Sequence, residues 1–287
     1  MKTIVILADG TSKTLKSMTN VAKLAASFDD DVVVYYDDGV GTEPGNVILG
    51  SLVGTQVDSN VLQCYEFLAL NYKKGDKVVF IGYSRGAYTI RSLAGLIYNS
   101  GLPRKENIHR INEAMDAYRS HHKPSSDMME MFRVNFGDRI KIDLMLMFDT
   151  VGSIVGQKFH DTVINRSVKR AVQFAAFDED RKVFSLVPIT KMSNTDTIWY
   201  KGDHGCVGGG YKKELDALSN IPLNKAAEEL AAIGVNTNLK PLKMDPKASF
   251  SKVYSGIRIF TSMFGRKKRV PGSYDYFDDS VIYRSIL

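Results

Sequence analysis

Residues 78–87 read Val78-Val79-Phe80-Ile81-Gly82-Tyr83-Ser84-Arg85-Gly86-Ala87, and this stretch decides the fold that we expect. Its apolar opening predicts a buried strand, and a helix-compatible stretch follows as far as Asn99. A serine between two glycines at a strand-to-helix junction is typical of a nucleophile elbow, in which the glycines make room for a strained turn. We therefore predict Ser84 as a nucleophile. The alternative is a turn whose small residues serve packing alone.

Apolar runs and helix-compatible stretches alternate along the chain, which is typical of a parallel sheet covered on both faces. The expected strands are residues 3–8, 31–36, 77–82 and 140–148, with weaker candidates at 183–189 and 196–201. The expected helices are residues 17–28, 55–73, 86–100, 106–121, 162–174 and 212–232. This order predicts an α/β fold, an α/β-hydrolase-like three-layer sandwich with a mostly parallel central sheet flanked by helices.

Composition narrows the class of protein. The 287 residues suit one domain spanning 1–287, and residues 233–287 read as a C-terminal excursion. Two cysteines exclude a disulfide scaffold and favour a reducing compartment. The first apolar run is too short for a signal peptide or a membrane span. We therefore expect a protein made in the cytoplasm, which would reach any other place by a route that needs no cleavable leader.

A serine hydroxyl needs a histidine base and a supporting carboxylate to become a nucleophile. Among five histidines, His204 follows an expected strand and precedes a glycine-rich turn, which places it well to reach Ser84. Asp149 ends an apolar run, where catalytic groups gather in an open α/β sheet. The order Ser84, Asp149, His204 is that of the α/β-hydrolases. The competing acids are Asp178, Asp180 and Asp203.

The serine mechanism also needs donors for the oxyanion that develops on the substrate. One donor is expected from the backbone N–H of Arg85, at the start of the helix after the serine. The loop after the first strand should supply the second, from the backbone of Gly10 or Thr11. Asp9 could instead bind a cation, but no cluster of carboxylates with metal-ligand spacing supports this. We therefore expect neither a metal nor another cofactor.

Seven short blocks occur in order between residues 9 and 211 and resemble one known family. They are Asp9-Gly10-Thr11, Thr19-Asn20-Val21, Tyr35-Tyr36 with Gly39-Val40-Gly41-Thr42, Gly82 to Ala87, Phe148-Asp149-Thr150-Val151-Gly152-Ser153, Asp178-Glu179 with Arg181 and Phe184, and His204 with Val207-Gly208-Gly209-Gly210-Tyr211. The family is DUF2235, the catalytic domain of type VI secretion phospholipase effectors of the Tle1 kind. Seven ordered blocks are far more specific than any single one.

The resemblance implies an α/β-hydrolase fold and a Ser-Asp-His triad that cleaves fatty acyl esters of phospholipids. It assigns these roles to Ser84, Asp149 and His204, and it adds an inhibitory or immunity protein as a partner to look for. Two positions depart from the family pattern: Cys206 stands where an Asp is usual, and residues 173–177 lack a histidine that often precedes the Asp-Glu block. These departures concern the substrate more than the hydrolytic chemistry.

The net charge of +6 favours attraction to anionic surfaces, although a basic enzyme without such a partner would have the same charge. Residues 250–264 have amphipathic spacing and precede a basic cluster, as in a helix that lies at a membrane interface; a core-packing helix with a basic end is the alternative. The cluster, which would contact an anionic membrane, consists of Arg266, Lys267, Lys268 and Arg269.

Three functions compete. The first is a serine esterase of the phospholipase or lipase type. The second keeps the triad but acts on a soluble ester, thioester or amide. The third is a hydrolase-like fold used for binding alone; it rests only on the basic charge, and we expect no nucleic-acid partner because no motif for one occurs.

Overall fold

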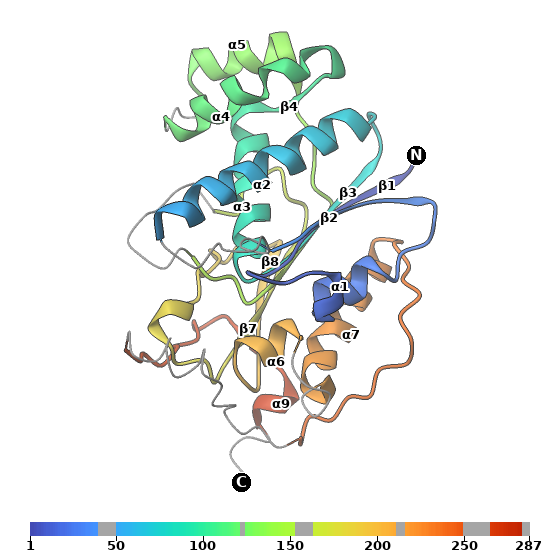
Figure 1. Cartoon of the computed structure of the whole chain (residues 1–287), viewed down its shortest axis with the longest axis vertical. Coiled ribbons are helices and arrows are strands. Elements are labelled where there is room, and N and C mark those ends of the chain that lie inside the picture. Colours follow the sequence, from blue (N-terminus) through green and yellow to red (C-terminus); the bar gives the residue numbers. More distant parts are fainter. Residues whose placement is uncertain (40–49, 121–123, 153–162, 211–215, 249–264, 283–287) are drawn as a thin grey trace.

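The computed structural model describes residues 1–39, 50–120, 124–152, 163–210, 216–248 and 265–282. Its centre is a seven-stranded sheet whose neighbouring strands all pair in parallel (Figure 1). The strand order is β2 (Val32–Asp37), β1 (Thr3–Ala8), β3 (Lys77–Tyr83), β6 (Leu144–Phe148), β7 (Ala171–Ala176), β8 (Thr195–Tyr200) and β9 (Tyr276–Phe277). A short antiparallel pair joins β4 (Leu102–Pro103) to β5 (Gly137–Asp138).

Helices cover both faces of this sheet. They are α1 (Asn20–Ala25), α2 (Gly50–Asn71), α3 (Arg85–Ser100), α4 (Ile111–Arg119), α5 (Asp127–Phe136), α6 (His204–Gly208), α7 (Asp216–Ala232) and α9 (Asp279–Ile282). Three 3₁₀ turns accompany them: η1 (Leu15–Ser17), η2 (Lys105–Arg110) and η3 (Lys182–Phe184). One core lies between the sheet and α2, α3 and α4, and the other between the sheet and α1, α6 and α7.

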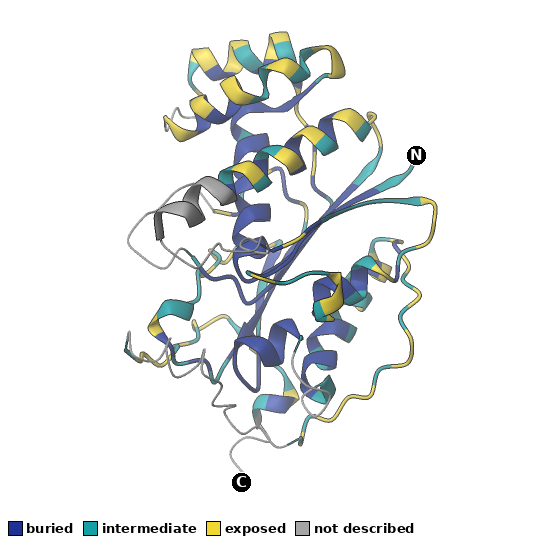
Figure 2. Ribbon diagram, in the orientation of Figure 1, coloured by how far each residue is buried: buried dark blue, intermediate teal, exposed yellow. Residues whose placement is uncertain are grey.

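Successive side chains of a strand face opposite sides of the sheet and therefore belong to different cores. In β1, Ile4 and Ile6 face one core while Val5 and Leu7 face the other, and all four are buried. Figure 2 shows the consequence, with buried strands at the centre and exposed residues on the outer sides of the helices. The predicted three-layer α/β-hydrolase-like sandwich is therefore confirmed.

Two element predictions were wrong. The helix expected at 162–174 is a loop from residue 163 followed by the buried strand β7, and the strand expected at 183–189 is η3 followed by a loop. The error at β7 has a physical reason: Ala171–Ala176 is buried on both faces, so no alternation distinguishes it from a buried helix. Several elements that were not expected also form, including α5 and β9.

The predicted C-terminal excursion returns to the sheet. Residues 233–248 run across the surface without a helix or strand of their own, and β9 pairs with the edge strand β8. The amphipathic stretch 250–264 lies outside the described residues. Within the described part of the chain, no helix combines the length and apolar character that crossing a membrane requires. The one-domain organisation stays a prediction.

Candidate active site

Ser84 occupies a tight turn between β3 and α3. Its backbone has φ 58° and ψ −122°, a strained conformation for a residue with a side chain, and its N–H donates to the Phe148 carbonyl over 2.9 Å. Close contacts require glycine at the positions two residues before and two residues after Ser84. A Cβ on Gly82 would lie 2.6 Å from the Ala87 Cα, and one on Gly86 would lie 2.1 Å from the Ala8 carbonyl oxygen. The elbow conformation expected from the sequence is present.

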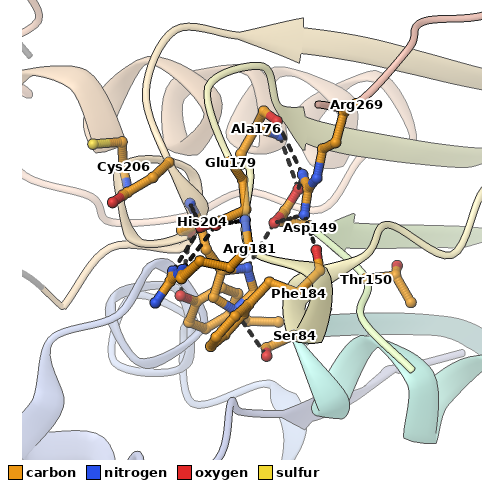
Figure 3. Close-up of polar contacts among 12 residues, drawn as sticks. Ser84, Asp149, Thr150, Ala176, Glu179, Arg181, Phe184, His204, Cys206 and Arg269 are labelled. Atoms are coloured by element: carbon orange, nitrogen blue, oxygen red, sulfur yellow. Dashed lines mark hydrogen bonds and ion pairs between the residues drawn. The ribbon is translucent and has the colours of Figure 1, made fainter. Parts of the chain in front are cut away.

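Three side chains from the carboxyl ends of three strands form one hydrogen-bonded chain (Figure 3). The His204 Nε2 atom lies 2.8 Å from the Ser84 Oγ, and the His204 Nδ1 atom lies 2.6 Å from the Asp149 Oδ2. In the tautomer with its proton on Nδ1, His204 donates to Asp149 and leaves Nε2 free to accept the serine proton. Asp149 is fully buried, and the other two residues are almost so.

Two aromatic rings pack against the His204 ring. The rings of Tyr83 and Phe184 each have their centroids 4.8 Å from it. The Tyr83 hydroxyl also donates to the His204 carbonyl over 3.2 Å, and the His204 N–H donates to Glu179 over 3.2 Å. His204 is the first residue of the short helix α6. The helical backbone and the two aromatic rings together restrict its side chain. The imidazole is therefore fixed in position before any substrate arrives.

A buried ion pair lies behind the His204 backbone. Glu179 accepts from the N–H and the guanidinium of Arg181, at distances of 2.6–3.0 Å, and the guanidinium lies 3.9 Å from the Phe184 ring centroid. Burial opposes the ionisation of Glu179, but the hydrogen bonds and charge of Arg181 outweigh it and lower the pKa of Glu179 to about 2. Both residues belong to the Asp-Glu block of the sequence, which had suggested no role for them.

Asp149 is paired with Arg269, a residue that the sequence led us to expect at a membrane surface. The Arg269 Nη1 lies 2.5 Å from the Asp149 Oδ1, and its Nη2 lies 3.0 Å from the Oδ2. Burial opposes the ionisation of Asp149, but the charge of Arg269 and the bonds from His204 and Arg269 together lower the pKa of Asp149 to about 2. Asp149 is therefore a carboxylate at neutral pH.

This ion pair corrects the prediction for the basic cluster. Arg269 was expected to face a membrane, but its side chain is only 6% exposed and lies against Asp149. Arg266, Lys267 and Lys268 are exposed. Spacing alone could not distinguish Arg269 from its neighbours, because its partner is 120 residues away in the chain.

The competing acids have other partners. Asp178 accepts from the N–H of Gly202 over 2.8 Å, and Asp180 pairs with Arg266 over 3.8 Å. Asp203 caps the start of α6 by accepting from the N–H of Cys206. Cys206 is buried inside α6, and burial raises the pKa of its thiol. Only Asp149 is bonded to the His204 ring among these acids in the described structure.

Of the other four histidines, one lies on another element and three lie outside the described residues. His109 lies on η2. His121, His122 and His160 are not among the described residues. His204 therefore lies within hydrogen-bond distance of Ser84, as predicted. A catalytic role for the pair stays a prediction.

The loop after β1 lies directly beside the serine. A Cβ on Gly10 would lie 3.3 Å from the Ser84 Cβ and 2.9 Å from the Tyr83 ring, so only glycine allows this approach. The Gly10 N–H donates to the Asp9 carboxylate over 2.6 Å. The Thr11 hydroxyl oxygen is buried and has no hydrogen-bond partner. The Gly10 N–H is therefore already bonded, whereas the Thr11 hydroxyl is not.

Asp9 anchors this loop and is not arranged as a metal ligand. Besides the Gly10 amide, it accepts from the Thr19 hydroxyl over 2.5 Å and from the Tyr36 hydroxyl over 2.6 Å. Burial raises the pKa of Asp9 above its ordinary range. Within the residues that the structure describes, no group of three or more His, Cys, Asp or Glu could hold a metal ion.

These contacts explain why the sequence blocks occur together. Thr19 and Tyr36 hold Asp9, and Asn20 donates to the carbonyls of Val207 and Ser219 over 2.9 and 2.8 Å. A Cβ on Gly208 would lie 1.9 Å from the Tyr83 ring, so this glycine lets α6 pack against the elbow. Blocks that are far apart in the sequence therefore converge on one site.

Comparison with protein families identifies the chain. The model of the type VI secretion phospholipase effector Tle1-like catalytic domain matches residues 2–229. The chain belongs to this family. An uncharacterized protein of Saccharomyces cerevisiae is 25% identical over 225 residues, which are 67% of this chain and 33% of the yeast protein.

Two solved structures are similar to the chain. An uncharacterized protein from Pseudomonas aeruginosa has 18% identity and a TM-score of 0.53, over 85% of this chain and 47% of that one. A Tle1 effector bound to the VgrG spike of the type VI secretion system has 19% identity and a TM-score of 0.45, over 76% of this chain and 53% of that one. The chain thus spans about half of these structures and about a third of the yeast protein.

Proposed function

We propose that this Tle1-like domain is a serine esterase that hydrolyses the acyl esters of phospholipids. The observation that carries the proposal is the hydrogen-bonded chain from Ser84 through His204 to Asp149. Ser84 Oγ attacks the ester carbonyl carbon while His204 Nε2 takes its proton, and Asp149 stabilises the imidazolium. His204 then protonates the departing alcohol, and a water molecule, activated by His204, releases the fatty acid from Ser84.

Donors around Ser84 support the same chemistry. The Arg85 N–H lies in the first turn of α3, where backbone amides have no partner within the helix and the helix dipole is positive. The Thr11 hydroxyl, in the loop after β1, is buried without a hydrogen-bond partner and is the second donor that we propose. These two groups would hold the oxyanion, which gains most of its stabilisation from donors that are fixed before the reaction.

A buried cation favours an anionic substrate over a neutral one. The Arg85 side chain is nearly buried, and burial lowers its pKa to about 10. In the described part of the chain no carboxylate pairs with it, and its Nη1 has no hydrogen-bond partner. A buried charge without a partner is costly. We propose that the phosphate of a phospholipid supplies the missing negative charge.

The first test compares Ser84 with a serine of the helix that follows it. Ser84→Ala is expected to abolish the release of fatty acid from phosphatidylglycerol vesicles and of p-nitrophenol from p-nitrophenyl butyrate. Ser92→Ala, at a buried serine of α3 that donates to the Tyr88 carbonyl, is the matched control and should keep the activity. A fluorophosphonate should label the native chain but not Ser84→Ala. Full activity of Ser84→Ala would show that another group is the nucleophile.

The second test separates phospholipid from a soluble substrate. Arg85→Met keeps the backbone amide, so it should lower kcat/KM on vesicles while leaving p-nitrophenyl butyrate hydrolysis nearly unchanged. The exposed Arg266, Lys267 and Lys268 provide the proposed contact with an anionic surface, and high salt should therefore reduce the rate on anionic vesicles. A native enzyme that cleaves soluble esters or thioesters but no vesicle lipid would favour the second function instead.

A further inference from the structure

We infer that Arg269 is a positioning residue of the active site, which clamps the triad acid and one of the rings that hold the histidine. The inference rests on the proposed function, since it assumes that Ser84, His204 and Asp149 carry out the reaction. Arg269 lies beyond residues 2–229, the part of the chain that the family model matches. The match to the family model therefore does not include this residue.

The guanidinium completes the bonding of the Asp149 carboxylate. Oδ1 accepts from Arg269 Nη1 over 2.5 Å and from the Ala176 N–H over 2.8 Å. Oδ2 accepts from Arg269 Nη2 over 3.0 Å and lies 2.6 Å from His204 Nδ1. An ionised carboxylate has about four acceptor sites, and all are used here. Without Arg269 two sites would stay empty in a place that water does not reach, and the carboxylate could turn away from His204.

The same guanidinium reaches the wall around the histidine (Figure 3). Nη1 donates to the Ala176 carbonyl over 2.9 Å, and Nη2 donates to the Phe184 carbonyl over 2.6 Å. The Phe184 ring in turn packs against the His204 ring. One planar fork therefore fixes the acid, the end of β7 and the residue that covers the imidazole, which a lysine with a single ammonium could not do.

Backbone contacts hold the arginine in its place. The segment before it pairs with residues 180–182: the Lys267 N–H donates to the Asp180 carbonyl over 2.7 Å, and the Lys182 N–H donates to the Gly265 carbonyl over 3.1 Å. Arg266 also forms an isolated β-bridge with Arg181. Residues 265–269 thus run as a strap beside the Glu179–Arg181 ion pair, and this strap delivers Arg269 to Asp149.

The experiment compares Arg269 with an arginine that pairs elsewhere on the sheet. Arg170 bonds Asp196 over 2.5 Å and Glu229 over 3.1 Å. It precedes β7, whereas Ala176 ends that strand, so Arg170 lies at the opposite edge from the triad. Arg269→Ala, Arg269→Lys and Arg170→Ala are assayed on p-nitrophenyl butyrate for kcat and KM, with the thermal midpoint measured in parallel and Ser84→Ala as the inactive reference.

We expect Arg269→Ala to lower kcat on the order of 100-fold with little change in KM, because a misplaced catalytic group costs about that much. Arg170→Ala should lower the thermal midpoint and keep kcat. Added methylguanidinium should restore part of the kcat of Arg269→Ala and have no effect on Arg170→Ala. Arg269→Lys should fold and lie between the native enzyme and Arg269→Ala, and it replaces the alanine variant if that variant does not fold.

Either of two results would overturn the inference. One is a native kcat in the Arg269 variants while Ser84→Ala is inactive. The other is an equal loss of kcat in Arg170→Ala, which would mean that stability alone explains the effect. Activity that persists in Ser84→Ala would instead contradict the proposed function, so the two failures can be told apart.

Discussion

Replacing Asp149 by asparagine changes one atom, and its effect follows from the four donors that surround the carboxylate. Placed at Oδ2, the amide nitrogen would donate to His204 Nδ1, and the imidazole proton would move to Nε2, the atom that must accept the Ser84 proton. Placed at Oδ1, it would face the Ala176 N–H and Arg269, both of which are donors. Neither orientation satisfies the site.

The Asp149→Asn substitution should lower both kcat and the free energy of unfolding. Loss of the correct tautomer should lower kcat about 10,000-fold, or about 5 kcal/mol of transition-state stabilisation. Breaking a buried pair should cost about 3 to 5 kcal/mol of the free energy of unfolding, because Arg269 keeps its charge without a partner.

The pH dependence of stability provides an independent test of the Asp149 ion pair. The pKa of Asp149 falls from 3.8 to about 2 on folding, which corresponds to about 2 kcal/mol. Because the folded value is the lower one, this contribution is complete above about pH 4 and is lost as the pH falls through about 2. Urea denaturation between these values should therefore be less dependent on pH in Asp149→Asn than in the native protein.

Asp203→Asn is the matched control, since asparagine caps a helix as well as aspartate does and this residue directly precedes His204. The assay is hydrolysis of p-nitrophenyl butyrate together with urea denaturation. Native kcat in Asp149→Asn, or an equal loss in Asp203→Asn, would refute the assignment of the acid.

Three further predictions concern the support of the site. Gly86→Ala should lower the free energy of unfolding by about 3 kcal/mol or more, because its Cβ would lie 2.1 Å from a β1 carbonyl oxygen. Glu179→Gln leaves Arg181 buried without its counter-charge and should cost about 3 to 5 kcal/mol; the native pKa of about 2 means that this contribution disappears as the pH falls from about 4.5 to 2. Tyr36→Phe removes a donor from Asp9 and should cost about 1 to 3 kcal/mol in urea denaturation.

Each of these has a control of the same chemistry. Gly272→Ala meets only the Asp275 side chain, at 3.4 Å or more, and Glu113→Gln removes an exposed partner of Arg110. Tyr35→Phe removes an exposed hydrogen bond of 3.5 Å. All three should be close to neutral, since surface pairs contribute little. Equal losses in a variant and its control would contradict the contact on which that prediction depends.

The sequence by itself determined the layers of the fold and the order of the candidate triad. Local rules were enough for this, because the buried run before Ser84 and the glycines around it depend only on neighbouring residues. Asp149 and His204 could be proposed because both follow strands, and the ends of parallel strands meet at one edge of a sheet. The same rules failed for β7, since a segment buried on both faces has no periodicity to reveal it.

Only the tertiary structure decided which partners each charged side chain has. Asp149, Asp178, Asp180 and Asp203 look alike in the sequence, and the structure separates them by what each one bonds. Arg269 looked like one of four basic residues for a membrane, yet it is bonded to an aspartate 120 residues away. A charge pair of this kind depends on distance in space and on exclusion of water, and neither is written in the spacing of residues along the chain.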